Sequence, residues 1–478
     1  MKNFIWSFVH SASLTGLSTV FVILLGNLMD PGEVGTYVAI LLLVNFMVNF
    51  LSLRIGGALV QKINDAKLAN DRNLFFTAGW ISVTLFGFVA MFIFWVFRFT
   101  ILDLFELAEN SRLVFAAVPL VFLQLQRTFF SRVLEANLMF KGQALSLMTA
   151  DLLKIIFALI FLRIGWNLEG VIISIYIADG TGTLAMLVQS LRKHRIVFER
   201  TSFPVLWNLL KFSAAMFIGS MAVFLDQRID LFFVNYYLDK DQVAIYNYAI
   251  KLPLMCFIIS NSLSRVTYPG MTRAFTSGAH DRIERIFSNC LDFSYSVISL
   301  ILLVFIIHAP YIIGAILPEK YIVMVPIISI LACGILLKAT VRSVGTMLTS
   351  KGMPYYGAIF NWVIVLVNAG LNLILIPKYG LAGAAVATSV SFAMKPFFVF
   401  AVAKFKLNIS YKYAKLTAGY LVFVTIVSCH SLAWDSILWS ELAILIYAMG
   451  LVFFFLDSPE RKNMTGWLKL HLYKTGDS

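Results

Sequence analysis

The sequence predicts an all-α polytopic membrane protein with about 14 transmembrane helices. Of its 478 residues, 60% are hydrophobic and only 13% are charged, and the mean hydropathy is +0.85, which lies outside the range expected of soluble domains. The apolar residues fall into long windows of roughly 20 residues, the length that an α-helix needs to cross a bilayer. The sequence does not show the segments of roughly ten residues, alternately apolar and polar, that are typical of a transmembrane barrel.

The predicted spans follow one another along the chain with short connections. They lie at 5–26, 34–53, 74–97, 112–130, 143–162, 169–190, 208–234, 243–264, 288–308, 321–341, 357–376, 383–403, 414–432 and 438–456. The clearest is the stretch from Val363 to Lys404, where two apolar runs joined by Pro377-Lys378-Tyr379-Gly380 predict a transmembrane hairpin. The first span is expected to be retained, because no small-residue cleavage site follows a short apolar region.

Lysines and arginines set the predicted orientation. With both termini in the cytoplasm, the outer segments hold only Arg98, Arg112, Arg163, Lys240, Lys320 and Lys378, as the positive-inside rule requires. The inner segments hold many more, among them Arg127, Arg132, Arg265, Arg273, Lys338, Arg342 and Lys351, and a basic cytoplasmic tail follows the last span. The net charge of +13 fits attraction to anionic headgroups. Because the basic residues are dispersed, nucleic-acid binding is not expected.

The absence of catalytic motifs from the sequence favours transport over catalysis. No GxxxxGK[ST], HExxH or GxSxG pattern and no His/Cys cluster occurs, and the longest predicted outer connection runs only from Phe97 to Arg112. The four cysteines are far apart and without a CxxC pair, so neither a metal site nor a disulfide framework is indicated. We therefore expect no enzyme, no metal and no bound cofactor.

An internal repeat predicts two six-helix lobes. The segment Met29 to Tyr37 resembles Leu238 to Tyr246, and Arg163 to Gly170 matches Lys378 to Gly383. The predicted division is an N-terminal lobe at 1–200, a C-terminal lobe at 201–405, and an extra helix pair with the basic tail at 406–478. Two units with an even number of helices share one orientation, so they would be related by an axis along the membrane normal, with a cavity between them.

Three segments resemble successive signatures of the polysaccharide transporter family, the O-antigen-type flippases of the multidrug/oligosaccharidyl-lipid/polysaccharide exporter superfamily. They are DPGEVGTYVAILLLVNFMVNFLSLRIGGALVQK, DQRIDLFFVNYYLDKDQVAIYNYA and NLILIPKYGLAGAAVATSVS. The resemblance implies a MATE-like fold that moves an undecaprenyl-pyrophosphate-linked repeat unit to the periplasmic leaflet by alternating access. It also implies the bacterial inner membrane, a role in O-antigen or other lipopolysaccharide synthesis, and a polysaccharide polymerase and a chain-length regulator as partners.

Charged side chains inside the spans are the candidate functional residues, because a charge at that depth is costly. Two sets are proposed. The cations Lys251, Lys395, Arg228, Arg54 and Lys154 would line a cavity that receives a pyrophosphate, and the acids Asp226, Asp230 and Asp179 would couple transport to H⁺ or Na⁺. Alternatively, the cations neutralise acids between helices and only hold the packing; Lys154 lies three residues from Asp151 and is placed to pair with it.

Three other functions stay open at this point. A MATE-type multidrug or cation antiporter predicts an acidic cavity, which the cations of the second half argue against. A membrane-embedded polymerase or ligase needs an outer loop larger than any found here. A scaffold without transport activity would be distinguished by an assay of translocation.

Overall fold

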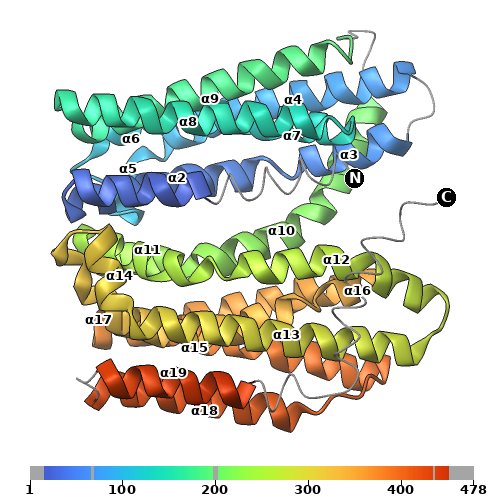
Figure 1. Ribbon diagram of the computed structural model, residues 1–478. Coiled ribbons are helices and arrows are strands. Elements are labelled where there is room, and N and C mark those ends of the chain that lie inside the picture. Colours follow the sequence, from blue (N-terminus) through green and yellow to red (C-terminus); the bar gives the residue numbers. More distant parts are fainter. Residues whose placement is uncertain (1–15, 66–68, 197–202, 434–436, 452–478) are drawn as a thin grey trace. The chain divides into compact units, whose positions relative to one another are not determined.

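Helices form all the regular structure of the part of the chain that the structure describes (Figure 1). This computed structural model describes residues 16–65, 69–196, 203–433 and 437–451. It divides into two compact units: unit 1 holds Met1–Tyr248, Ile316–Tyr321 and Asn361–Ala384, and unit 2 holds Ala249–Ala315, Ile322–Phe360 and Ala385–Ser478. The two units are defined by contacts within the structure, whereas the predicted lobes are defined by the internal sequence repeat. The predicted lobe boundaries at 200 and 405 therefore stay a prediction.

The number of predicted spans agrees with the described helices. Eleven helices are long and apolar enough to cross a membrane, and Gly16–Leu28 and Trp439–Leu451 are shorter apolar helices. One of the eleven, Tyr355–Leu407, contains both arms of the predicted hairpin. The two shorter helices correspond to the predicted spans 5–26 and 438–456, which run partly outside the described residues. With these two included and the arms counted separately, the described part of the chain agrees with the expected 14. The chain is a multi-pass membrane protein.

Unit 1 is built from the first ten described helices, the start of the next one and the segment Asn361–Ala384 of α17 (Pro354–Leu407). They are Gly16–Leu28, α2 (Pro31–Leu51), α3 (Ile55–Asp65), α4 (Ala69–Val96), α5 (Arg98–Leu104), α6 (Ser111–Ala117), α7 (Pro119–Ala136), α8 (Phe140–Ile164), α9 (Asn167–Leu191), α10 (Phe203–Tyr237) and the start of α11 (Lys240–Leu254). Proline opens α2 and α7, where its missing N–H costs no helical hydrogen bond. Helices α7, α8 and α9 pack against one another and bring together the charged residues described below.

Unit 2 contains the rest of the helical chain apart from a piece of α17. Its helices are α12 (Phe257–Thr276), α13 (His280–Ile307), α14 (Ala309–Ile316), α15 (Val325–Arg342), α16 (Thr346–Ser350), α18 (Tyr413–Ala433) and α19 (Ile437–Leu451), with the 3-10 turn Glu319–Met324 before α15. The predicted extra pair, α18 and α19, packs on α13. Asp292 of α13 accepts hydrogen bonds from Tyr411 Oη at 2.7 Å and Lys415 Nζ at 3.1 Å, so a polar contact fixes the start of α18.

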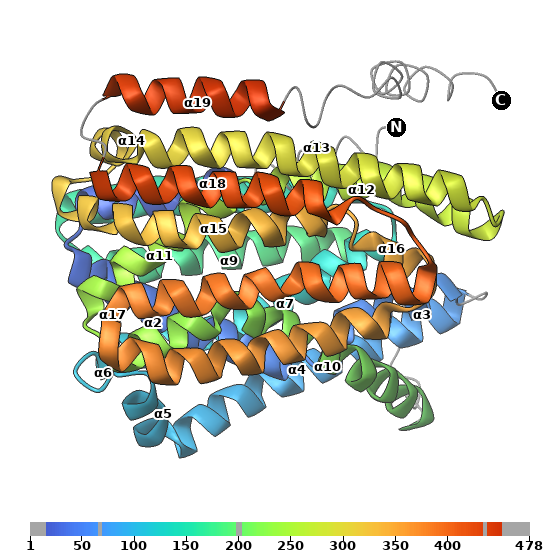
Figure 2. The same cartoon turned by 90° about the horizontal axis from the view of Figure 1, so that it is seen from below.

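The hairpin predicted at Pro377–Gly380 is confirmed. Helix α17 (Pro354–Leu407) reverses at Gly380, whose φ of 55° and ψ of −134° interrupt the helix, and the turn of the orange ribbon is visible in Figure 2. A Cβ on Gly383 would overlap the carbonyl oxygen of Leu375, so glycine permits the tight reversal. Gly165, the repeat-related residue between α8 and α9, is also left-handed at φ 87°, which supports the repeat.

Several helices are longer than their predicted spans. Arg132 lies within α7, Arg265 and Arg273 within α12, and Arg342 within α15, beyond the ends of the predicted spans 112–130, 243–264 and 321–341. The reason is that a hydropathy window stops at the first charge. A helix continues wherever its backbone is hydrogen-bonded and its charged side chains find partners.

The two repeat-related segments meet each other inside unit 1. A Cβ on Gly35 would overlap the carbonyl oxygen of Lys240, so the starts of α2 and α11 are in backbone contact. Lys320 Nζ lies 2.8 Å from Asp30 Oδ1, and Tyr248 Oη donates to Val22 O at 2.6 Å. Glycine at position 35 is therefore required by packing, and it places two helix starts, similar in sequence, against one another.

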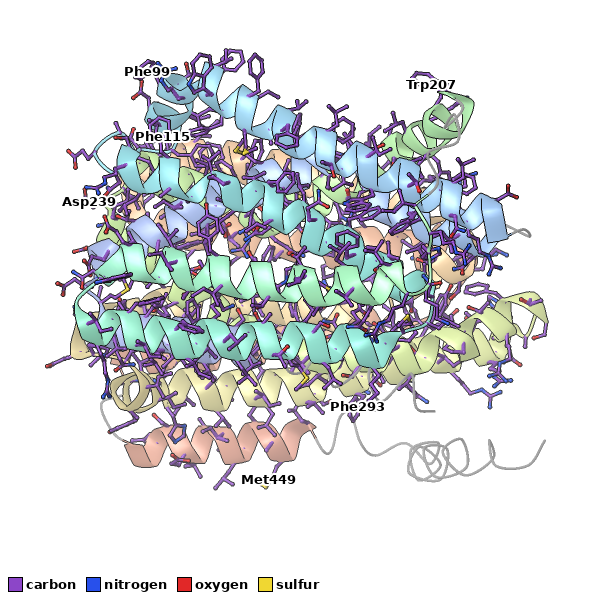
Figure 3. All side chains as sticks on the ribbon, turned by 90° about the horizontal axis from the view of Figure 1, so that it is seen from above. Phe99, Phe115, Trp207, Asp239, Phe293 and Met449 are labelled. Carbon is purple, nitrogen blue, oxygen red and sulfur yellow. The ribbon has the colours of Figure 1, made fainter. Side chains whose placement is uncertain are left out.

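Apolar side chains cover much of the outer surface of the helices. Phe99, Phe115, Trp207, Phe293 and Met449 are exposed by 67%, 44%, 57%, 36% and 54% and project from the ribbon (Figure 3). Large apolar side chains exposed in such number fit a lipid environment, because lipid tails impose no penalty on them.

His194 ties three segments of unit 1 together just beyond the end of α9. Its buried ring stacks on Phe76, with centroids 5.0 Å apart. Its Nε2 lies 2.9 Å from Asn137 Nδ2, and its Nδ1 lies 3.3 Å from Asn73 Oδ1. An amide N–H facing Nε2 and an amide oxygen facing Nδ1 fit a neutral ring that carries its proton on Nδ1.

We expect low pH to weaken the contacts that His194 makes with its neighbours. Burial, with the charges of Arg72 and Lys193, lowers the pKa of His194 from its ordinary value. The unfolded chain then binds more protons, so the free energy of unfolding falls as the pH drops below about 6.5, by at most about 1.4 kcal/mol per pH unit for one group. Thermal unfolding in detergent across this range measures the effect. His194→Gln should reduce the slope and His280→Gln, at an exposed histidine, should not; an unchanged slope in His194→Gln would contradict the assignment.

Candidate functional site

Four charged side chains form a cluster in the interior of unit 1. Arg127 of α7 donates a short hydrogen bond to Asp179 Oδ1 of α9, and its second terminal nitrogen lies 3.6 Å from Asp151 Oδ1 of α8. Lys154 Nζ donates to the same Asp151 oxygen at 3.1 Å, which confirms the pairing expected from their spacing. Two cations thus face two carboxylates, and their formal charges cancel.

The cluster is shielded from solvent on both sides. Asp179 is 1% and Asp151 5% exposed, and Lys154 Nζ lies 4.8 Å from the centroid of the Phe21 ring. Asp179 Oδ2 is buried and makes no hydrogen bond within the described part of the chain, and the same holds for Thr183 Oγ1 one turn along α9. Asp179 therefore keeps one carboxylate oxygen without a hydrogen bond among the described residues, which an ion-coupling role would require.

Arg54 lies at a strained break between α2 and α3. Leu53 and Arg54 both have positive φ values, 40° and 59°, a conformation that side chains other than glycine rarely adopt. Arg54 is half-buried, and burial and the nearby charge of Arg132 lower its pKa. Arg132 itself donates to Glu135 Oε2 at 2.6 Å, so a carboxylate already balances one of the two guanidinium groups. Strained backbone concentrates at functional sites, so Arg54 stays a candidate.

The charged residues of α10 differ in burial. Asp226 and Asp230 are buried, whereas Arg228 is half-buried. Asp230 Oδ2 accepts a hydrogen bond from the buried Tyr246 Oη at 2.9 Å, and Asp230 Oδ1 accepts one from the backbone N–H of Leu231 at 2.9 Å. Asp230 is therefore fixed in position by its own helix and by α11.

The other two predicted cations belong to unit 2. Lys251 lies in α11 and Lys395 in the second arm of α17, and both side chains are half-buried. Counted along the helices, Lys251 is about 17 Å from the start of α11 and Lys395 about 18 Å from the end of α17, which is close to mid-bilayer. Arg54, Lys154 and Arg228 belong to unit 1. The single cavity shared by all five cations stays a prediction.

Sequence reasoning missed the surroundings of two basic residues. Arg127 was counted with the basic residues of the inner segments, yet it bridges two buried acids; Lys338 was counted in the same way, yet it is buried in α15. The available signal was spacing, because Lys338 and Arg342 are four residues apart and share one helix face. No group of three or more His, Cys, Asp or Glu side chains able to hold a metal occurs among the described residues.

Comparisons with known proteins place this arrangement in a known fold. The structure of the lipid II flippase MurJ in an inward closed conformation superposes with a TM-score of 0.74 at 16% identity, covering 94% of this chain and 98% of that one. An inward-facing MATE-family multidrug resistance transporter of the MOP superfamily gives 0.64 at 12% identity, covering 85% and 94%. The chain therefore shares the fold of these helical membrane proteins.

The sequence also matches, over residues 24–326, the family described as polysaccharide biosynthesis protein. The chain belongs to this family. Two curated relatives are each 22% identical: the probable low-salt glycan biosynthesis flippase Agl15 of Haloferax volcanii over 213 residues, 45% of either chain, and an uncharacterized membrane protein of Methanocaldococcus jannaschii over 426 residues, 81% of this chain and 80% of the other. The chain thus spans about half the length of the first relative.

Removing the guanidinium of Arg127 should destabilise unit 1 strongly. Arg127→Gln would leave Asp179 buried without its cation, a change that costs about 3–5 kcal/mol for a buried ion pair. The double variant Arg127→Gln/Asp179→Asn should recover part of this loss, because no uncompensated charge remains. Thermal unfolding in detergent measures both. If the double variant is less stable than Arg127→Gln, the ion pair is not the source of the stability.

Proposed function

We propose that this protein is a flippase that moves an oligosaccharide linked to a polyprenyl diphosphate from the cytoplasmic to the outer leaflet by alternating access. Membership of the polysaccharide biosynthesis family and the fold shared with MurJ support transport of a lipid-linked glycan. The observation that carries the proposal is the position of Lys251 and Lys395 within the spans of unit 2. Lysine at that depth is costly unless it serves a ligand or a partner, and a diphosphate is a ligand of the matching charge.

The carrier and the polymer are the finer part of the proposal. The family resemblance implies undecaprenyl diphosphate, a bacterial inner membrane with both termini cytoplasmic, and synthesis of O-antigen or another surface polysaccharide. A polymerase and a chain-length regulator would then receive the product. Because both curated relatives are archaeal proteins, we define the substrate by its chemistry, a glycan on a polyprenyl diphosphate.

An antiporter of cationic drugs is the alternative that the MATE fold raises. Such a protein needs acidic groups in its interior with charge to spare. In unit 1 the acids Asp151 and Asp179 are balanced by Arg127 and Lys154. This cluster therefore offers no spare negative charge to a cationic drug. The intramembrane cations Lys251 and Lys395 favour an anionic substrate instead, and with it a transporter over an enzyme.

Neutralising either predicted cation should abolish translocation. We expect Lys251→Ala and Lys395→Ala cells to accumulate lipid-linked units on the cytoplasmic leaflet, at wild-type levels of protein in the membrane, because the diphosphate loses its counter-charge. Lys406→Ala is the matched control, since Lys406 is exposed at the end of the same helix as Lys395. Leaflet-specific labelling of the lipid-linked glycan in a deletion strain reads out the result. Normal outward transport in both variants would refute the cationic site.

Ion coupling is the remaining part of the proposal. Outward movement of a negative charge from a negative interior gains about 2.3 kcal/mol per 100 mV for each charge, and exchange for H⁺ or Na⁺ through Asp226, Asp230 or Asp179 would add to it. In proteoliposomes, we expect transport to slow when the coupling-ion gradient is dissipated, and Asp179→Asn or Asp230→Asn to abolish that dependence. Transport that is indifferent to both ion gradients would remove the coupling.

A further inference from the structure

An arginine at the corner between α4 and α5 lies over two exposed aromatic rings. The guanidinium carbon of Arg98 is 4.4 Å from the centroid of the Phe99 ring and 5.5 Å from that of the Trp95 ring. Both distances are within the reach of a cation–π interaction. Trp95 and Phe99 are 61% and 67% exposed, whereas Arg98 is half-buried. Figure 3 shows Phe99 projecting from the ribbon.

The contacts of Arg98 leave its charge and most of its donors in place. One terminal nitrogen, Nη1, donates to the backbone carbonyl oxygen of Trp95 at 2.9 Å, and a guanidinium has five N–H groups. Among the described residues, the other donors of Arg98 make no hydrogen bond, and no carboxylate forms an ion pair with it. Since the two rings and the carbonyl carry no net charge, the guanidinium stays a cation with donors to offer.

The length of α4 places Arg98 in the headgroup layer of the bilayer. About 36 Å of helix separates Arg72, near the start of α4, from Val96 at its end. This exceeds the ~30 Å of a hydrocarbon core and falls short of the ~40–45 Å that includes both headgroup layers. Arg72 then lies at one interface and Arg98 at the other, which the positive-inside pattern predicts to be the outer one.

An exposed apolar stripe on α4 leads to this arginine. Its side chains follow the three- and four-residue spacing of a single helix face. They are Ile81, Leu85, Phe88, Phe92 and Trp95, exposed by 44%, 58%, 56%, 64% and 61%. A molecule that is apolar along its length and anionic at one end matches the stripe and the guanidinium together.

Contacts with α6 and α7 cover another side of α4. Gln126 of α7 accepts a hydrogen bond from Trp80 Nε1 at 3.0 Å and donates one to Thr84 Oγ1 at 2.9 Å. Phe94 is 2% exposed, and its ring lies 5.5 Å from that of Phe115 in α6. These contacts fix the rotation of α4, so the stripe is held on the surface of unit 1.

We infer that Arg98, with Trp95 and Phe99, binds the phosphate of an outer-leaflet phospholipid whose acyl chains lie along the α4 stripe. A guanidinium matches two phosphate oxygens through parallel hydrogen bonds. The two rings hold the guanidinium plane in advance, which lowers the entropic cost of binding. The site goes beyond the proposed function, because it belongs to the lipid-exposed surface and does not depend on translocation.

Quenching of Trp95 fluorescence by brominated lipids tests the site in the full chain. One set of phosphatidylcholine nanodiscs contains a fixed fraction of brominated phosphatidylglycerol, and a parallel set contains the same fraction of brominated phosphatidylcholine. Because the chain has nine tryptophans, the Trp95 signal is taken as the difference from Trp95→Phe in each background. We expect phosphatidylglycerol to be enriched about fivefold beside Trp95, which corresponds to about 1 kcal/mol for one basic residue at an anionic surface.

Removing the charge should abolish this preference. Arg98→Gln is expected to be quenched equally by both lipids. Arg98→Lys keeps the charge but loses the planar fork, so it should retain part of the enrichment. Arg163→Gln is the matched control, because Arg163 is an exposed arginine at the end of α8 that is predicted to lie on the same side of the membrane; its enrichment should stay at the wild-type level.

Three results would overturn the inference. Unchanged enrichment in Arg98→Gln would remove Arg98 from the site. An equal loss in Arg163→Gln would make the preference a property of the outer surface as a whole. Displacement of the brominated phosphatidylglycerol by a lower concentration of farnesyl diphosphate would reassign the site to a diphosphate-bearing lipid.

Discussion

The cost of placing charge inside a membrane governs the structure of this protein. Arg127, Asp151, Lys154 and Asp179 lie in helices α7, α8 and α9, where water is not available to solvate them. Each carboxylate is paired with a cation, and each cation with a carboxylate. Because the paired residues come from three helices, no single helix could neutralise all of its own charges. In lipid, where no hydrophobic effect draws helices together, such contacts and close packing carry the association. The fold of unit 1 therefore depends on these ion pairs between helices.

Unit 2 stabilises its charged residues in more than one way. Asp292 of α13 accepts a hydrogen bond from Lys415, as the carboxylates of unit 1 do from their cations. Lys338 and Arg342 of α15 also lie over the rings of Phe392 and Phe257, and Arg342 donates to the amide oxygen of Asn261. Carboxylate, amide and aromatic partners from neighbouring helices therefore share the stabilisation of charge in this unit.

Glycine supplies the second requirement of a membrane fold, close approach of backbones. Gly35 lets the start of α2 contact the start of α11, and Gly380 with Gly383 lets α17 reverse within a few residues. These positions correspond to the repeat signals recognised in the sequence, the pair Met29–Tyr37 and Leu238–Tyr246 and the link around Gly380. The repeat is thus visible in sequence where the backbone leaves no choice of residue.

The sequence by itself determined the membrane class, the 14 helices, the hairpin at Gly380 and the Asp151–Lys154 pair, because hydropathy, turn chemistry and spacing along one helix are local properties. It could not determine that Arg127 reaches Asp179, since they are 52 residues apart and only the packing of α7 on α9 brings them together. Nor could it separate Lys338 from an ordinary interfacial lysine, because the ring beneath it belongs to α17. Contacts between helices distant in the chain depend on how the faces pack, and only the tertiary structure decided them.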